Sequence, residues 1–225
     1  MNEQFPWLRR AVLLTGGKTR LAVDTAVTAL LENDTGAAGR VRELERLVDS
    51  MYYGINEYCL ETLASQQFGR QEINVITCSL KIAIELERIS DYANQIAKLV
   101  QRKLSCQDTS LLRNVRELTG AMCCQTLTML EQSLASYETG DCQLANQVIS
   151  ADAAVNKRNK ELFREMLCVL SVNPWVQEAV MDYHIAIRYI ERAADRTTNI
   201  SELVHYMTEG KSRKKLLYSE DIWHD

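Results

Sequence analysis

The chain has 225 residues, of which 46% are hydrophobic and 25% are charged, and its formal net charge at pH 7 is −4. A chain of this length can bury a proper core in one domain or in two small ones. The mild negative charge provides no basis for a nucleic-acid-binding surface. Because only two prolines and nine glycines interrupt a sequence rich in Leu, Ala, Glu and Arg, the composition predicts an all-α protein.

The N-terminal segment and the cysteines bear on the compartment. Residues 1–10 mix charged with apolar residues and contain no signal-peptide core, and no apolar run approaches the roughly 18–20 residues that a membrane span requires. The seven cysteines form no C-x-x-C pair, so we interpret them as small core residues rather than as a zinc or redox site. We therefore expect a cytoplasmic protein.

Breaker residues divide the chain into six segments of helical periodicity, in which apolar residues recur at i, i+3, i+4 and i+7. Pro174 is placed to start the sixth helix. Helices of roughly 25–35 residues joined by short loops predict antiparallel neighbours in a bundle. The breaks fall at residues 33–36, 67–69, 104–109, 139–141 and 171–174, and the sixth segment ends near residues 209–210.

The first segment contains LTGGKTR (14–20), whose Gly17-Lys18-Thr19 matches the end of a P-loop. The first glycine of that motif would fall on Val12, and no strand precedes it, so we reject nucleotide binding here. The paired glycines predict a bend or break in the first helix.

Acidic residues recur at a nearly constant spacing in the two halves of the chain. Glu191 and Asp195 each follow Glu87 and Asp91 by 104 residues, and Asp152 follows Asp49, in the preceding segment, by 103. This offset predicts a duplicated three-helix unit. We expect two tandem three-helix bundles of long antiparallel helices, over residues 1–106 and 107–210, followed by a basic and then acidic tail over residues 211–225.

The repeated acidic pairs are electrostatically unfavourable. Glu87 and Asp91 lie four residues apart, as do Glu191 and Asp195, so each pair lies on one face of its helix and repels by about 0.2–0.5 kcal/mol. Neither Glu87 nor Asp152 has a basic residue three or four positions away, so local ion pairs do not explain the whole pattern. Two explanations stay open, a solvated acidic face or a divalent or trivalent cation bound by several carboxylates.

The segments around these pairs, LKIAIELERISDYANQIAK (80–98) and IAIRYIERAADRTTNISELV (185–204), resemble the repeated LERIxDxxxNIAE-like signature of the PhoU family. The resemblance covers both halves, over about residues 20–210. It implies two tandem three-helix bundles and a non-catalytic, cytoplasmic regulator that acts negatively in phosphate transport and homeostasis.

The resemblance also implies metal ions at the acidic pairs, with iron or zinc expected and magnesium, manganese or calcium as further candidates. In the first copy Lys98 replaces the family's terminal acid, whereas Asn199 and Glu202 keep the pattern in the second copy, which therefore follows the family more closely. The expected ligands are Glu87 and Asp91 in the first unit, Glu191 and Asp195 in the second, and Asp49 and Asp152 in the preceding helices.

The partners that the resemblance implies are a phosphate transporter or its ATPase and a sensor histidine kinase, with peripheral membrane contact and a homodimer as further expectations. The basic run over residues 211–215 we interpret as solvated. Two alternatives to a metal-binding adaptor stay open. One is a metal-dependent enzyme, either a phosphoester hydrolase or ferroxidase-like, and the other is a metal-free helical interaction module.

Two histidines offer rival sites. Glu202 and His205 have the Glu-x-x-His spacing of di-iron bundles, but that chemistry requires a second copy, and the equivalent residues one repeat earlier are Lys98 and Gln101. We therefore expect His205 to be a partly exposed helix residue with a hydrogen bond near the helix end. His184, seven residues before Glu191, is a weak candidate ligand.

Overall fold

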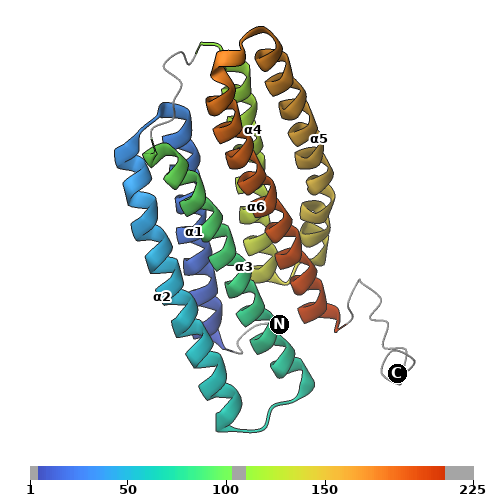
Figure 1. The fold of residues 1–225 in the computed structure, drawn as a ribbon. Helices are drawn as coiled ribbons and strands as arrows, with labels where there is room; N and C mark the ends of the chain where they lie inside the picture. The colour runs from blue at the N-terminus through green and yellow to red at the C-terminus, as the bar shows by residue number, and fades with distance from the viewer. Residues whose placement is uncertain (1–4, 103–109, 211–225) are drawn as a thin grey trace, which may run out of the picture.

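The computed structural model describes residues 5–102 and 110–210, which form six long α-helices and contain no strand (Figure 1). The predicted all-α class and the six helical segments are confirmed. The helices are α1 (Pro6–Glu32), α2 (Thr35–Ser65), α3 (Arg70–Gln101), α4 (Arg113–Thr139), α5 (Cys142–Val172) and α6 (Gln177–Glu209), with a 3₁₀ turn, η1 (Pro174–Val176), before α6.

The breaker residues act as helix caps. α1 ends at Asn33 and α4 at Gly140, both in the left-handed conformation, with φ of 56° and 72°. Asp34 and Asp141 then cap α2 and α5, since the carboxylate of each accepts hydrogen bonds from two backbone N–H groups of the following turn. Pro174 starts the 3₁₀ turn rather than α6 itself.

The helices form two three-helix bundles that pack side by side, as Figure 1 shows. Helices α1, α2 and α3 contact one another in the first bundle, and α4, α5 and α6 do so in the second. Between the bundles α3 packs against α6 and α1 against α4, while α2 and α5 lie at the two outer edges. The predicted architecture of two three-helix bundles is confirmed.

Polar contacts join the two bundles through α3 and α6. The carboxylate of Glu85 on α3 accepts hydrogen bonds from the guanidinium of Arg196 and the amide of Asn199, both at 3.3 Å. Beside this group the rings of Tyr92 and Tyr189 stack with centroids 5.8 Å apart. The family residue Asn199 therefore binds the neighbouring bundle rather than an acidic pair.

The expected bend or break at the paired glycines is wrong, because α1 runs through them without interruption. Gly16 is buried where α1 meets α4, and a Cβ there would lie 2.5 Å from Leu134 Cδ1. The hydroxyl of Thr19 is buried and donates to the backbone carbonyl of Leu86 at 3.3 Å. This segment therefore serves helix packing.

The cysteines are only partly core residues. Cys59, Cys78 and Cys123 are buried as expected, whereas Cys124 and Cys168 are exposed and Cys142 is half-buried. The expectation is wrong for the last three, because they lie on outer helix faces or at a helix end, where small residues are not enclosed.

Several sequence-based predictions lie outside the described residues. These are the core position expected for Cys106, the junction between residues 106 and 107, which stays a prediction, and the tail over residues 211–225 with its basic run. Within the described part of the chain, no helix is both long enough and apolar enough to span a membrane.

Candidate metal centre

The first acidic cluster consists of Asp49, Glu87 and Asp91, which meet between α2 and α3. Each contributes a carboxylate oxygen, and the three oxygens lie within 4.8 Å of one another. On α3 the fully buried Leu86 and Ile89 point into the core, so Glu87 and Asp91 lie at the edge of the buried face. All three acids are half-buried as a result.

The surroundings of the first acidic cluster raise the pKa of all three carboxyls. Burial is the largest cause in each case, followed by repulsion from Glu45 and Asp91 at Asp49, and from Asp91 and Asp49 at Glu87. At Asp91 the repulsion comes from Glu45, while Lys98 lowers the pKa in part. The ionised cluster is therefore strained by its own charge.

Glu45 is a fourth acid that the sequence-based site does not include. It lies one helical turn before Asp49 on α2, and the side-chain amide of Asn94 on α3 donates to it at 2.9 Å. Glu45 and Asp49 repeat the i, i+4 acidic spacing seen on α3, so the same signal that selected Glu87 and Asp91 could have identified Glu45.

The first acidic cluster fits a hard metal ion. Oδ1 of Asp49 is buried and has no hydrogen-bond partner within residues 5–102 and 110–210, which leaves a carboxylate oxygen without compensation. Carboxylate oxygens are suitable ligands for iron, zinc, magnesium, manganese and calcium. A cation held by Asp49, Glu87 and Asp91 would remove the repulsion among them and provide positive charge for an anionic ligand.

The second acidic cluster consists of Asp152 on α5 and Glu191 and Asp195 on α6. Burial is the largest cause that raises the pKa of Asp152, and repulsion from the carboxylate of Glu191 raises it further. The pKa of Asp195 is also raised, first by partial loss of hydration at its carboxylate and then by repulsion from Asp152 and Glu191. The residue is exposed when all its atoms are considered. In the described structure these three acids do not place one carboxylate oxygen each within 4.8 Å of one another.

Protein donors already bind two of the three carboxylates of the second acidic cluster. The amide of Asn159 donates to Glu191 at 2.7 Å, and the guanidinium of Arg188 forms an ion pair with the same carboxylate. The amide of Asn156 donates to Asp152 at 2.7 Å, although Oδ1 of Asp152 is buried without a hydrogen-bond partner. The second cluster is therefore partly neutralised by its own neighbours.

The described geometry favours the first acidic cluster, whereas the sequence pattern favours the second, and the order of metal affinity stays a prediction. Lys98, which replaces the family's acid, is exposed and only moderates the pKa of Asp91, so the first cluster keeps its three oxygens together. In the second cluster Arg188 and Asn159 bind Glu191 directly. The arrangement of these side chains therefore favours the first acidic cluster as the stronger cation site.

Neither histidine belongs to an acidic cluster. His184 packs against the ring of Phe163, with centroids 6.1 Å apart, and lies in a groove that also contains Lys160, Arg164 and Arg188. His205 is 3% exposed, so the expected partial exposure is wrong, because α5 covers the C-terminal end of α6. Its expected hydrogen bond is present, to Asn146 at 3.1 Å.

A family model of the PhoU domain matches the chain twice, over residues 12–100 and 120–204. The chain belongs to the PhoU family. Each match contains one of the two acidic clusters, so the duplication inferred from the 104-residue offset coincides with the family's repeat. The recognition made from the signature segments is confirmed.

Relatives and solved structures of the PhoU family cover most of the chain. It is 31% identical over 209 residues to the phosphate-specific transport system accessory protein PhoU homolog of Pseudomonas putida, an alignment that covers 93% of this chain and 80% of that protein. It is 27% identical over 210 residues to the accessory protein PhoU of Escherichia coli, covering 93% and 86%.

The crystal structure of PhoU from Pseudomonas aeruginosa matches with a TM-score of 0.81 and 28% identity, covering 92% of this chain and 98% of that one. PhoU from Streptococcus pneumoniae matches with a TM-score of 0.80 at 20% identity, which shows the shared fold.

Proposed function

We propose that this protein is a cytoplasmic accessory protein of phosphate transport that binds metal ions at its acidic clusters and acts as an adaptor without catalysing a reaction. Membership of the PhoU family and relatives named as accessory proteins of the phosphate-specific transport system support the transport role. The metal-binding part rests on one observation, the three carboxylate oxygens of Asp49, Glu87 and Asp91 within 4.8 Å, with Oδ1 of Asp49 lacking a hydrogen-bond partner.

The proposed partners are a phosphate transporter or its ATPase and a sensor histidine kinase. A multivalent cation at the first acidic cluster adds positive charge to a surface that otherwise repels anions, so an acidic or phosphorylated group of a partner can complete its coordination. Anionic lipid head groups offer the same chemistry, which makes peripheral membrane contact part of the proposal. Metal occupancy then controls docking, and a homodimer is compatible with this role.

Elemental analysis tests metal binding, on full-length protein purified without a chelating column. The decisive variant is Asp49→Asn/Glu87→Gln/Asp91→Asn, which removes the charges of the first acidic cluster while keeping side-chain size. Its matched control is Glu57→Gln/Glu61→Gln, because these two acids lie four residues apart on the exposed face of α2. We expect bound iron or zinc in the wild type and control, and a loss of at least half of it in the triple variant.

Docking is measured separately, by co-purification with the transporter ATPase and the sensor kinase with and without chelator. Equal binding by the wild type and the triple variant would reject metal-controlled docking. Phosphoester hydrolysis and ferroxidase activity of the metal-loaded protein are measured in parallel, and turnover that the triple variant loses would establish an enzyme. A protein that contains no metal and still binds its partners would be a metal-free interaction module.

A further inference from the structure

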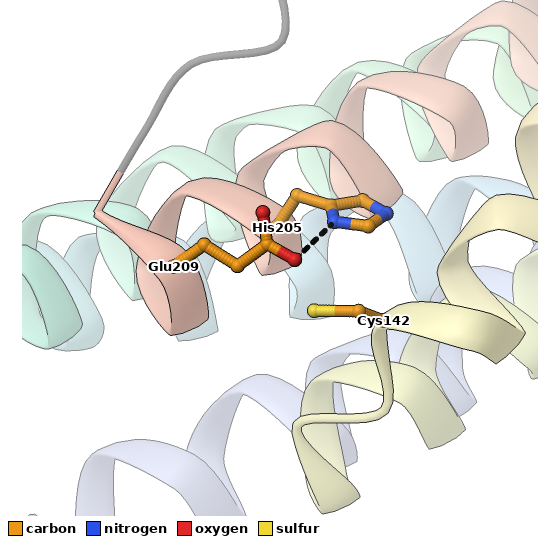
Figure 2. A group of neighbouring side chains, drawn as sticks. All are labelled: Cys142, His205 and Glu209. Atoms are coloured by element: carbon orange, nitrogen blue, oxygen red, sulfur yellow. Dashed lines mark ion pairs between the residues drawn. The ribbon is translucent and has the colours of Figure 1, made fainter.

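A second kind of metal-ligating group lies at the far end of the second bundle, away from the acidic residues. It consists of Cys142 in the first turn of α5 and His205 and Glu209 in the last turns of α6 (Figure 2). One ligand atom from each of the three residues lies within 4.8 Å of the other two. We propose that these three side chains form a binding site for zinc or a similar borderline transition metal, independent of the acidic clusters and of the proposed transport function.

The hydrogen bonding of His205 prepares one ring nitrogen for a metal. Nε2 lies 3.1 Å from Oδ1 of Asn146, and because an amide oxygen only accepts hydrogen bonds, Nε2 carries the proton. Nδ1 of the neutral ring therefore presents a lone pair. A metal-binding histidine commonly donates its other N–H in this way, which fixes the tautomer and the ring orientation.

The lone pair of Nδ1 has no hydrogen-bond partner among the residues that the structure describes. His205 is only 3% exposed, and Nδ1 is buried and unpaired. Oε1 of Glu209 lies 3.7 Å from Nδ1, a contact that Figure 2 marks with a dashed line. A carboxylate oxygen and a neutral imidazole nitrogen are both acceptors, so a cation between them is required to make this contact favourable. The cation is either a proton on Nδ1 or a metal ion.

Cys142 favours the metal over the proton. Its thiol reaches the same space from α5, so a sulfur, an imidazole nitrogen and a carboxylate oxygen converge on one point, and a proton on Nδ1 would use only the last two. A metal ion binds all three groups, and the thiol proton is released to solvent as the thiolate coordinates.

The spacing of the three ligand atoms and their types, sulfur, nitrogen and oxygen, are suitable for tetrahedral zinc. Bond lengths of tetrahedral zinc to sulfur, nitrogen and oxygen place the ligand atoms about 3.3–3.6 Å apart. The observed 3.7 Å between the ligand atoms of His205 and Glu209 is close to this, and the 4.8 Å limit on Cys142 requires only a small closure. Three protein ligands leave the fourth position for water or for a donor from another molecule.

The site has no counterpart in the first bundle, so it is not part of the duplicated acidic pattern. The residue 104 positions before His205 is Gln101, which is a poor metal ligand. A bound zinc would link the start of α5 to the end of α6 and so stabilise that end of the second bundle.

Cobalt provides a test that the acidic clusters do not obscure, because only a thiolate ligand gives a near-ultraviolet sulfur-to-cobalt charge-transfer band. Chelator-treated, reduced full-length protein is titrated with Co²⁺ and then with Zn²⁺. We expect a band that zinc abolishes, that Cys142→Ser removes, and that the control Cys124→Ser retains, because Cys124 is exposed on α4 outside the site. The variant Asp49→Asn/Glu87→Gln/Asp91→Asn should keep the band.

Two further variants complete the test. Glu209 is exposed, so Glu209→Gln should fold normally and weaken cobalt binding at least about tenfold. Asn146→Ala, which frees the other nitrogen of His205, should weaken it about 10–100-fold without removing the band. Absence of the band in the wild type, or its persistence in Cys142→Ser, would overturn the proposal and leave a charged His205–Glu209 pair as the explanation.

Discussion

The strain within the first acidic cluster predicts that Asp91→Asn stabilises the metal-free protein. Two unit charges 4.8 Å apart, the upper limit for the oxygens of Asp49, Glu87 and Asp91, repel by about 0.9 kcal/mol in the dielectric of water. Asp91 repels both Asp49 and Glu87, whose pKa values it raises, and attraction to the exposed Lys98 offsets part of the repulsion. We therefore expect the free energy of unfolding to rise by about 1 kcal/mol when Asp91 loses its charge.

With metal bound, the wild type should be more stable than Asp91→Asn. A bound cation stabilises the wild type by about 2.7 kcal/mol at a free metal concentration one hundred times its dissociation constant. Asp91→Asn replaces one of the three carboxylates by a neutral amide, which is a weaker ligand for a cation, and therefore gains less. The assay is urea unfolding of both proteins in chelator and in excess metal. Unchanged or lower stability of Asp91→Asn in chelator would refute the repulsion argument, and unfolding midpoints that metal does not shift would refute the site.

The pH dependence gives the same prediction an independent measurement. The pKa of Asp91 is raised above its ordinary value of 3.8, so the folded protein holds this proton at pH values where the unfolded chain has lost it. The free energy of unfolding of the metal-free protein should therefore fall as pH rises from about 4 through the raised pKa, and then level off. Asp91→Asn should flatten this slope, whereas Glu61→Gln on the exposed face of α2 should leave it unchanged.

Two further predictions concern helix packing and the contact between the bundles. Gly17→Ala should stabilise the protein by about 0.5–1 kcal/mol, because a Cβ there meets nothing within 4 Å. Gly16→Ala should lose that gain, because its Cβ would contact Leu134 on α4. Thermal unfolding of the two variants measures the difference. Glu85→Gln removes the half-buried charge that binds Arg196 across the bundles and should cost about 1–3 kcal/mol in urea unfolding, while the exposed control Glu117→Gln should cost less than about 0.5 kcal/mol.

Local signals were sufficient to predict most of the fold. Asn33 and Gly140 end their helices in the left-handed conformation, and Asp34 caps the next helix, so each predicted break has a cause within a few residues. The duplication followed from the spacing of acids far apart in the chain. The paired glycines misled because their role depends on Leu134, a residue more than a hundred positions away whose side chain occupies the space beside Gly16.

The members of the acidic clusters could be predicted from spacing, but their relative strength could not. Helical periodicity places Glu87 beside Asp91 and Glu191 beside Asp195 on one face each. The charge repulsion within such a pair depends on the facing helix. Helix α5 provides Asn159, whose amide donates to Glu191, whereas α2 provides Glu45, which repels Asp91. The family pattern ranked the copies by Lys98, Asn199 and Glu202, and it took no account of Asn159 and Glu45 on the facing helices.

The Cys142 site shows why residue spacing along one helix can point to the wrong partner. Along α6 the sequence offers Glu202 three residues before His205, which resembles a di-iron motif, and also Glu209 four residues after it. Both acids lie on the same side of an α-helix as the histidine. Only the packing of α5 against α6 decides between them, because it brings Cys142 to the end of α6 that carries Glu209 and leaves Nδ1 of His205 facing that pair. A metal site assembled across a helix pair therefore depends on the register of the pair, which no single-helix motif encodes.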